Sequence, residues 1–271
     1  MNVLNIGLED IDNVVFNSFK QQLKNLEAKK VFPEEFFKDI QERKYPYVYN
    51  FLFSSSCQNI SLYRDLFREL YLEKSKSIKE ILLKQRVAGK NSFSDFDLDL
   101  RSSFFASLDD FDNSAFFLEG VISDIADLNR KLHEKGPNYL NIGITKRGTG
   151  LKKSNPEAYA NRVRKTIYWK NTNKTYLDKI YFESQKENAL FDIKQDYFPN
   201  ELNFMYLMED DPENVEGMLK NEIPVILIHY FSEEHNKIEV YLKRRYSKLL
   251  TVVDTHAEAK IAALDIAKKY E

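Results

Sequence analysis

Cysteine is nearly absent from this sequence, because Cys57 is the one cysteine among 271 residues. A single cysteine can form neither an intrachain disulfide nor a thiolate metal cluster. The first residues, MNVLNIGLED, also lack a basic stretch followed by an apolar core, so no secretory signal is expected. These absences predict an intracellular, cytoplasmic protein.

Long hydrophobic runs are missing too. The longest, around IPVILIHYF, is about half of the roughly 20 residues that a membrane-spanning helix needs, and it predicts a buried strand instead. The four histidines show no HExxH or other close metal-ligand spacing. The P-loop pattern GxxxxGK[ST] and the nucleophile elbow GxSxG are absent as well. Nucleoside triphosphate hydrolysis and serine-type hydrolysis therefore receive no support.

The composition that remains is that of a folded, water-soluble chain. Hydrophobic residues make up 43% of it and aromatic residues 14%, which is too much for disorder, while 30% of the residues are charged at a net charge of −2. A length of 271 residues can bury one large core or two modest ones. One or two domains are expected.

A change of pattern near the breaker Lys135-Gly136-Pro137-Asn138 divides the chain into residues 1–135 and residues 136–271. The first region is predicted to be mainly helical, with amphipathic spacing in 11–30, 60–85 and 114–133. Between these helices an acidic and aromatic block, residues 93–117, is typical of a solvated loop or edge. It is also a candidate surface for partner contact.

The second region alternates strand-like and helix-like segments. Strands are predicted at NFMYLMED, IPVILIHYF, KIEVYLKRRY and LLTVV, and Thr255 with Glu258 forms a capping box before a last helix. The predicted fold class is α+β or α/β, with a helical N-terminal part followed by a mixed β-sheet flanked by helices. The strand–strand–helix ending also resembles the tail of a double-stranded RNA-binding domain in a generic way.

A strongly basic segment runs from Lys146 to Lys174 and carries nine basic residues against Glu157. Nine minus one gives +8, so the rest of the chain sums to −10. Such segregation indicates a face that binds a polyanion through phosphate contacts. A helix capped by Asn155 with Pro156 at its first position is predicted here, and Trp169 is expected to pack inward. The candidate nucleic-acid-binding residues are Lys146, Arg147, Lys152, Lys153, Arg162, Arg164, Lys165 and Lys170.

A hairpin is predicted directly after this segment, between Thr175 and Tyr197. Its two runs, TYLDKIYF and ALFDIKQDYF, flank the polar turn ESQKEN, which would set Asp178 across from Asp192 roughly 5 Å apart. Lys194 would share a face with Asp192 because side chains alternate along a strand. Two carboxylates suit Mg²⁺, and a lysine beside them can orient a water that attacks a phosphodiester.

The spacing of an acid, about a dozen residues and then Asp-Ile-Lys resembles the PD-(D/E)xK nuclease superfamily, and type II restriction endonucleases in particular. The resemblance implies a restriction-endonuclease-like core and a Mg²⁺-dependent endonuclease that cleaves double-stranded DNA. Asp178 and Asp192 would be catalytic metal ligands and Lys194 the catalytic lysine. By analogy a homodimer is expected, with residues 1–135 as a dimerisation or DNA-clamping part. Residues 136–271 would then catalyse and bind the nucleic acid.

Other interpretations stay open. The phrase LNIGITKR resembles the second strand of GIY-YIG nucleases, in which case Arg162 or Arg164 would matter more than Lys194. A non-catalytic nucleic-acid-binding or phage-defence-associated interaction protein would use the same basic segment without the metal site. A purely structural or partner-binding protein would show no affinity for polyanions even at low salt.

Overall fold

The protein is described here from a computed structural model, which divides the chain into two compact units. The first unit comprises Met1–Asn17, Gln58–Ser61 and Phe117–Glu271, and the second comprises Ser18–Cys57 and Leu62–Phe116. The structure describes residues 2–12, 14–16, 121–228 and 233–271, and all of them belong to the first unit. The predicted helix at 60–85 and the acidic block at 93–117 lie outside the described residues.

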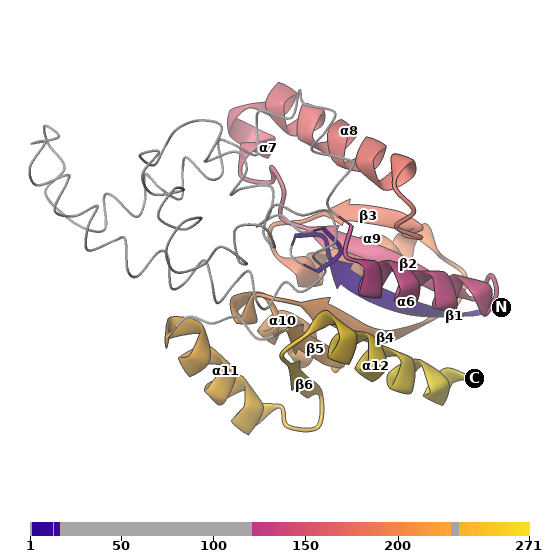
Figure 1. Cartoon of the computed structure of the whole chain (residues 1–271). Coiled ribbons are helices and arrows are strands. Elements are labelled where there is room, and N and C mark those ends of the chain that lie inside the picture. Colours follow the sequence, from indigo (N-terminus) through magenta and orange to yellow (C-terminus); the bar gives the residue numbers. More distant parts are fainter. Residues whose placement is uncertain (1, 13, 17–120, 229–232) are drawn as a thin grey trace, which may run out of the picture. The chain divides into compact units, whose positions relative to one another are not determined.

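One parallel sheet organises the described part of the chain (Figure 1). Its six strands follow the order β3-β2-β1-β4-β5-β6, and every pair is parallel. The strands are β1 (Val3–Asp10), β2 (Tyr139–Thr145), β3 (Lys179–Phe182), β4 (Glu201–Glu209), β5 (Val225–Ile228) and β6 (Leu250–Val253). The prediction of an α/β fold with a helix-flanked sheet is confirmed, whereas the expected mixed sheet is corrected to a parallel one.

Helices cover both faces of this sheet. They are α6 (Ser123–Glu134), α7 (Leu151–Ser154), α8 (Pro156–Thr172), α9 (Ala189–Asp196), α10 (Glu216–Lys220), α11 (Glu233–Arg245) and α12 (His256–Ala267), with short 3₁₀ turns η3 (Lys186–Asn188), η4 (Pro212–Asn214) and η5 (Lys268–Tyr270). Helices α6 and α12 pack together on one face, and α9 to α11 contribute to a core on the other. None of the helices in the described ranges is long and apolar enough to cross a membrane.

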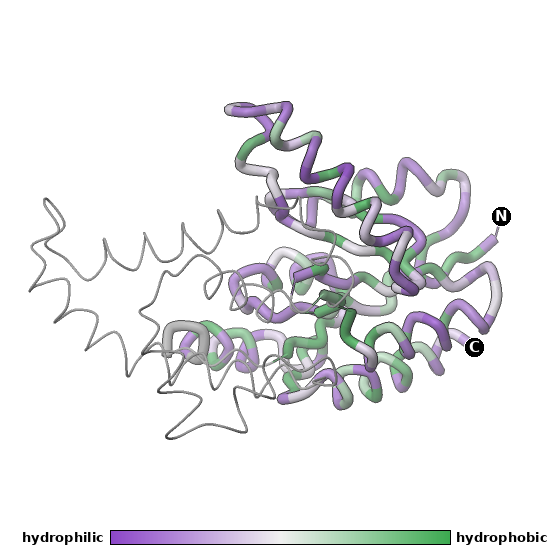
Figure 2. Tube along the Cα trace, turned by 45° about the horizontal axis from the view of Figure 1, so that its top comes forward, coloured by the Kyte–Doolittle hydropathy of each residue, from purple (hydrophilic) through white to green (hydrophobic). Residues whose placement is uncertain are grey.

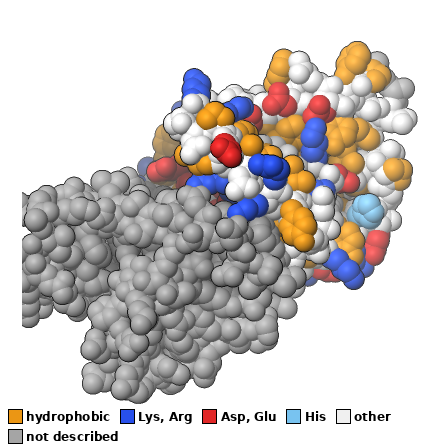
Figure 3. All heavy atoms as spheres, turned by 90° about the horizontal axis from the view of Figure 1, so that it is seen from above, with side chains coloured by type: hydrophobic (Ala, Val, Ile, Leu, Met, Phe, Trp, Pro, Cys, Tyr) orange, Lys and Arg blue, Asp and Glu red, His pale blue; other side chains and the backbone are white. Residues whose placement is uncertain are grey.

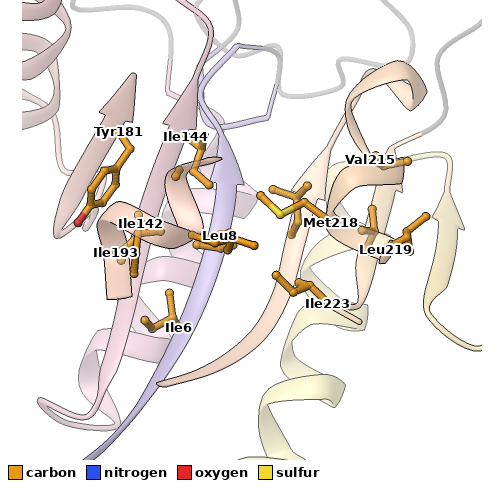
Figure 4. Packing of buried hydrophobic residues seen from close by; sticks show 14 of the residues in the cluster. Ile6, Leu8, Ile142, Ile144, Tyr181, Ile193, Val215, Met218, Leu219 and Ile223 are labelled. Atoms are coloured by element: carbon orange, nitrogen blue, oxygen red, sulfur yellow. The ribbon is translucent and has the colours of Figure 1, made fainter. Parts of the chain in front are cut away.

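A hydrophobic core lies between the strands and the α9–α10 side. Ile6 and Leu8 of β1 meet Ile142 of β2 and Ile193 of α9, and all four are fully buried (Figure 4). Strand β5, VILI, is apolar and buried at every position, as expected for a parallel strand that is covered by helices on each side. In the hydropathy-coloured trace the outlying helix α8 is mostly hydrophilic (Figure 2).

Several local predictions are confirmed. Helix α8 begins at Pro156, and the Asn155 side chain accepts a hydrogen bond from the Ala158 amide. Trp169 is buried, and the capping box of Thr255 and Glu258 is present at the start of α12. The two caps depend on residues within one turn of chain, so tertiary packing has little opportunity to override them.

Two strand predictions are wrong for a common reason. The segment KIEVYLKRRY lies mostly in helix α11, and ALFDIKQD forms helix α9 instead of the second strand of a hairpin. In α9 the buried residues Leu190 and Ile193 are three positions apart, which puts both on one helix face. Aromatic and β-branched content favoured strands, but the spacing of the buried residues is helical.

Candidate active site

The chemistry-bearing residues gather where three neighbouring strands end. Asp10 ends β1, Thr145 ends β2, and Glu209 ends β4 and is followed by Asp210. Because the strands are parallel, their carboxyl ends meet at one edge of the sheet. The chain order reverses between β1 and its two neighbours, and in open α/β sheets ligands bind at this switch point.

Three carboxylates form the centre of this edge. Asp10, Glu209 and Asp210 are all buried, and one oxygen from each lies within 4.8 Å of the other two. Lys186, from η3 after β3, reaches between them with a side chain that is 1% exposed. Its Nζ atom is 2.8 Å from Asp10 Oδ1 and also donates a hydrogen bond to Glu209 Oε2.

Burial makes these charges strongly interdependent. Removal from water raises the pKa of the Asp10 carboxyl well above its ordinary value, Glu209 raises it further, and Lys186 opposes both effects. Burial would lower the pKa of Lys186, but Asp10 and Glu209 together raise it above its ordinary value. Three carboxylates and one ammonium sum to −2 when all are ionised. A bound divalent cation would neutralise that charge.

Hydrogen bonds divide the carboxylates into two kinds. Glu209 has both oxygens engaged, since Oε2 accepts from Lys186 and Oε1 accepts from the amides of Asp210 and Asp211 at 3.1 Å each. In Asp10 the contacts of Lys186 and of the Ile11 amide both fall on Oδ1. Within the described ranges no hydrogen bond involves Asp10 Oδ2. Glu209 therefore fixes Lys186, whereas Asp10 retains an oxygen for a ligand.

These donors fit Mg²⁺. The ion prefers hard oxygen ligands, is usually held by one or two carboxylates, and keeps open positions for substrate phosphate. Asp10 and Asp210 are the carboxylates that would hold it here. Among the described residues this is the one group of three His, Cys, Asp or Glu side chains close enough to share an ion.

A second charged pair lies at the rim of the site. Asp12, two residues after Asp10, is engaged by Arg147, whose Nε is 2.9 Å from Oδ2 and whose Nη2 is 2.5 Å from Oδ1. The guanidinium stands 5.0 Å from the centre of the Phe16 ring. The neighbouring residue, Lys146, donates a hydrogen bond to the side-chain oxygen of Asn214. Residues just after β2 thus reach the segments that follow β1 and β4.

The residues predicted for the nuclease site lie elsewhere. Asp178 precedes β3, and its Oδ2 accepts a hydrogen bond of 2.7 Å from the Asn141 amide, near the amino end of β2. Asp10 is level with Ile144, three residues further along that strand, or about 10 Å away along the strand. Asp192 and the exposed Lys194 are on helix α9. The hairpin that would have set Asp178 opposite Asp192 does not form.

The predicted basic residues fall into three places. Lys146 and Arg147 are at the rim of the acidic site, and Lys152 and Lys153 are exposed on α7. The other four, Arg162, Arg164, Lys165 and Lys170, are on α8. Lys and Arg side chains are visible among hydrophobic ones on the α7–α8 side (Figure 3). Lys170 donates hydrogen bonds to the carbonyls of Leu177 and Asp178, at 3.1 and 3.2 Å.

The central residues were not singled out from the sequence, although a signal exists. The apolar segments VLNIGL, NIGI and NFMYLM are each followed directly by Glu-Asp or Thr. In a parallel sheet, polar residues at the ends of apolar strands meet at one edge. Lys186 carries no such signal, because it is one lysine within a polar turn.

Comparisons with known proteins complete this picture. No protein-family model matches the chain, and no curated protein sequence is significantly similar to it. Among solved structures it is similar to a phosphonoacetaldehyde hydrolase-like protein from Oleispira antarctica, with 12% identity, 99% of this chain and 94% of that chain covered, and a TM-score of 0.44. It is similar to L-2-haloacid dehalogenase from Xanthobacter autotrophicus, with 9% identity, coverage of 95% and 97%, and a TM-score of 0.41. A third match, provisionally described as a haloacid dehalogenase-like hydrolase from Burkholderia xenovorans, has 12% identity, coverage of 97% and 98%, and a TM-score of 0.41.

The prediction of a PD-(D/E)xK nuclease is wrong. The sheet is parallel rather than mixed, and Asp192 with Lys194 belongs to helix α9, so the hairpin that would have paired Asp178 with Asp192 does not form. The predictions of a restriction endonuclease and of double-stranded DNA as its partner are wrong as well. The homodimer loses its basis too, since it was expected from the need to cut two strands.

Proposed function

We propose that the protein is a Mg²⁺-dependent phosphohydrolase that acts on phosphomonoesters and uses Asp10 as its nucleophile. One observation supports this most directly: the buried set of three carboxylates and Lys186 at the switch point of a parallel sheet. Its surplus of negative charge suits a divalent cation, and its ammonium suits a phosphoryl group. The donors suit Mg²⁺ in kind and in charge.

Asp10 has the features of a carboxylate nucleophile. Its Oδ1 is held by Lys186 and by the Ile11 amide, so the orientation of the carboxylate is fixed. Asp10 would attack phosphorus through a carboxylate oxygen, forming a P–O bond to Asp10 while the bond from phosphorus to the leaving oxygen breaks. A water would then attack phosphorus of this acyl phosphate, releasing inorganic phosphate and regenerating the carboxylate.

The surrounding residues have distinct parts in these steps. Asp12 is the nearest carboxyl on the same segment, and its charge acts on Asp10; it would donate a proton to the leaving oxygen and take one from the attacking water. Lys186 and the Thr145 hydroxyl would stabilise the phosphoryl oxygens. When bound, Mg²⁺ supplies positive charge that lets the Asp10 carboxylate approach the phosphate.

The test is phosphate release by the purified full-length chain from p-nitrophenyl phosphate. We expect activity that requires Mg²⁺, disappears with EDTA, and falls by on the order of 10³-fold or more in Asp10→Asn. Asp265→Asn, a matched change of an exposed acid on α12, should leave it intact. Activity that is equal in Asp10→Asn and wild type would refute the assignment.

A further inference from the structure

The Arg147–Asp12 pair lies at the rim of the proposed site. Arg147 contacts both carboxylate oxygens of Asp12, with Nε to Oδ2 at 2.9 Å and Nη2 to Oδ1 at 2.5 Å. A guanidinium binds the oxygens of carboxylate and phosphate groups in this same two-pronged manner. An anionic group of a substrate can therefore replace Asp12 as the partner of Arg147.

Arg147 is buried against aromatic rings, which hold its guanidinium in place. Its side chain is 8% exposed, compared with 30% for Asp12. The guanidinium lies over the Phe16 ring, and that ring meets Trp169 edge-on with 5.4 Å between centres. When the Asp12 contacts open, the guanidinium would remain on this aromatic support, with its donors directed to the rim of the site.

Lys146 adds a second cation beside it. Lys146 donates a hydrogen bond to a neutral amide, the side chain of Asn214, and among the described residues it forms no ion pair. Asn214 follows β4, and Asp12 follows β1, so the two cations reach across the switch point from the end of β2. Asp10 is level with Ile144, two residues before Lys146, which puts their Cα atoms roughly 8 Å apart across adjacent strands.

We infer that Arg147 and Lys146 bind a second anionic group of the substrate, and that this group takes over the Arg147 donors that Asp12 occupies in the structure. The inference rests on the proposed phosphohydrolase function and deepens it. The substrate class is a small phosphomonoester with a phosphate or carboxylate a few bonds from the ester. Guanidinium binds both groups in the same planar manner.

The experiment compares three substrates that share a three-carbon chain: propyl phosphate, 3-(phosphonooxy)propanoate and propane-1,3-diyl bisphosphate. With Mg²⁺, the wild type should favour at least one of the two doubly anionic substrates by about tenfold or more in kcat/KM. A gain for one of them alone identifies the second group as carboxylate or as phosphate. Equal kcat/KM for all three would overturn the inference and leave the phosphohydrolase intact.

The variants separate substrate binding from simple support of Asp12. Arg147→Gln should lower kcat/KM for the doubly anionic substrates by a larger factor than for propyl phosphate, because only those substrates carry the second anionic group. Lys146→Gln should show the same order of losses. If Arg147→Gln lowers all three equally while its unfolding midpoint matches wild type, Arg147 only positions Asp12 and the inference fails. No phosphate release from any substrate by the wild type would refute the proposed function itself.

Discussion

At the scale of single residues, Lys186 determines whether the acidic site can exist without metal. Its ammonium is buried and contacts both Asp10 and Glu209. Replacing it by methionine keeps the side-chain length but leaves carboxylates buried with no cation, which is costly because charges lose solvation in the interior. The residue therefore contributes to stability as well as to phosphate binding.

We predict that Lys186→Met lowers the free energy of unfolding by about 3 kcal/mol or more in metal-free buffer. Mg²⁺ should recover part of the loss, since it supplies positive charge to the same carboxylates. Urea unfolding with and without Mg²⁺ measures both effects. Lys194→Met is the matched control, because Lys194 is exposed on α9. Equal stability of the two variants would show that Lys186 does not hold the site together.

Glu9 is another buried acid, on the opposite side of β1 from Asp10 because side chains alternate along a strand. It accepts a hydrogen bond of 2.8 Å from Asn129 Nδ2. Burial raises the pKa of Glu9 from 4.5 to about 8, and the Asn129 bond only partly opposes this. The folded protein therefore binds the Glu9 proton more tightly than the unfolded chain does.

The stability that Glu9 contributes is fully present below pH 4.5 and is lost as the pH rises through about 8. Glu9→Gln cannot ionise. We therefore predict that the free energy of unfolding of Glu9→Gln, relative to that of wild type, increases from pH 4.5 to about 8 and is constant above that. Unfolding curves across the pH range test this, with Glu134→Gln as an exposed control. A difference between Glu9→Gln and wild type that does not change with pH would contradict the burial argument.

Only part of the site could be predicted from single residues in the sequence. Lys146 and Arg147 stood out through local charge density, although the structure places them beside an acidic site. Asp10 and Glu209 did not stand out, because the chain has 42 acidic residues and nothing local distinguishes these two. Their convergence depends on strand order, which brings residues about 200 positions apart into contact through Lys186.

At the scale of elements, β2 has to leave room for the turn that follows β1. A Cβ atom on Gly143 would lie 2.6 Å from Ile11 Cδ1 and 3.2 Å from Ile180 Cγ1. Ile11 is fully buried and stands between Asp10 and Asp12. A side chain at position 143 would push on the segment that carries both carboxylates.

We predict that Gly143→Ala lowers kcat/KM for phosphomonoester hydrolysis by between about tenfold and a hundredfold, because small displacements of reacting groups are costly. Gly150→Ala is the matched control: its added Cβ meets no atom within 4 Å, and its φ of −61° suits any residue. Steady-state kinetics of both variants decide the matter. Similar rates in the two would mean that Ile11 can shift without moving the carboxylates.

Helices were predicted correctly where the signal was local, and the predictions were wrong where a strand-like composition competed with a helical spacing. The caps at Asn155 and Thr255 identified α8 and α12 correctly. Ile238 and Leu242 of α11 and Tyr246 directly after it recur every four residues and all pack in or against the core, yet the β-branched and aromatic content suggested a strand. Composition outweighed spacing in the prediction, whereas burial follows spacing in the fold.

At the scale of the whole molecule, the sheet joins the start of the chain to its last third. Strand β1 lies between β2 and β4, so residues 3–10 pair with residues from 139 onward. The division expected at residue 135 followed the breaker Lys135-Gly136-Pro137-Asn138 and the change of pattern beside it, which are both local signals. A central strand separated from its partners by more than 120 residues leaves no local trace, because pairing is decided by tertiary burial.

The central claim is that Asp10 becomes transiently phosphorylated, and trapping that species tests it most directly. The full-length protein would be mixed with Mg²⁺ and a radiolabelled phosphomonoester, quenched in acid, reduced with borohydride and mapped by peptide mass spectrometry. Reduction converts a phosphorylated aspartate to homoserine. We predict homoserine at position 10 in the wild type and no label in Asp10→Asn. Rapid release of phosphate with no modification at position 10, or a label that persists in Asp10→Asn, would contradict the account.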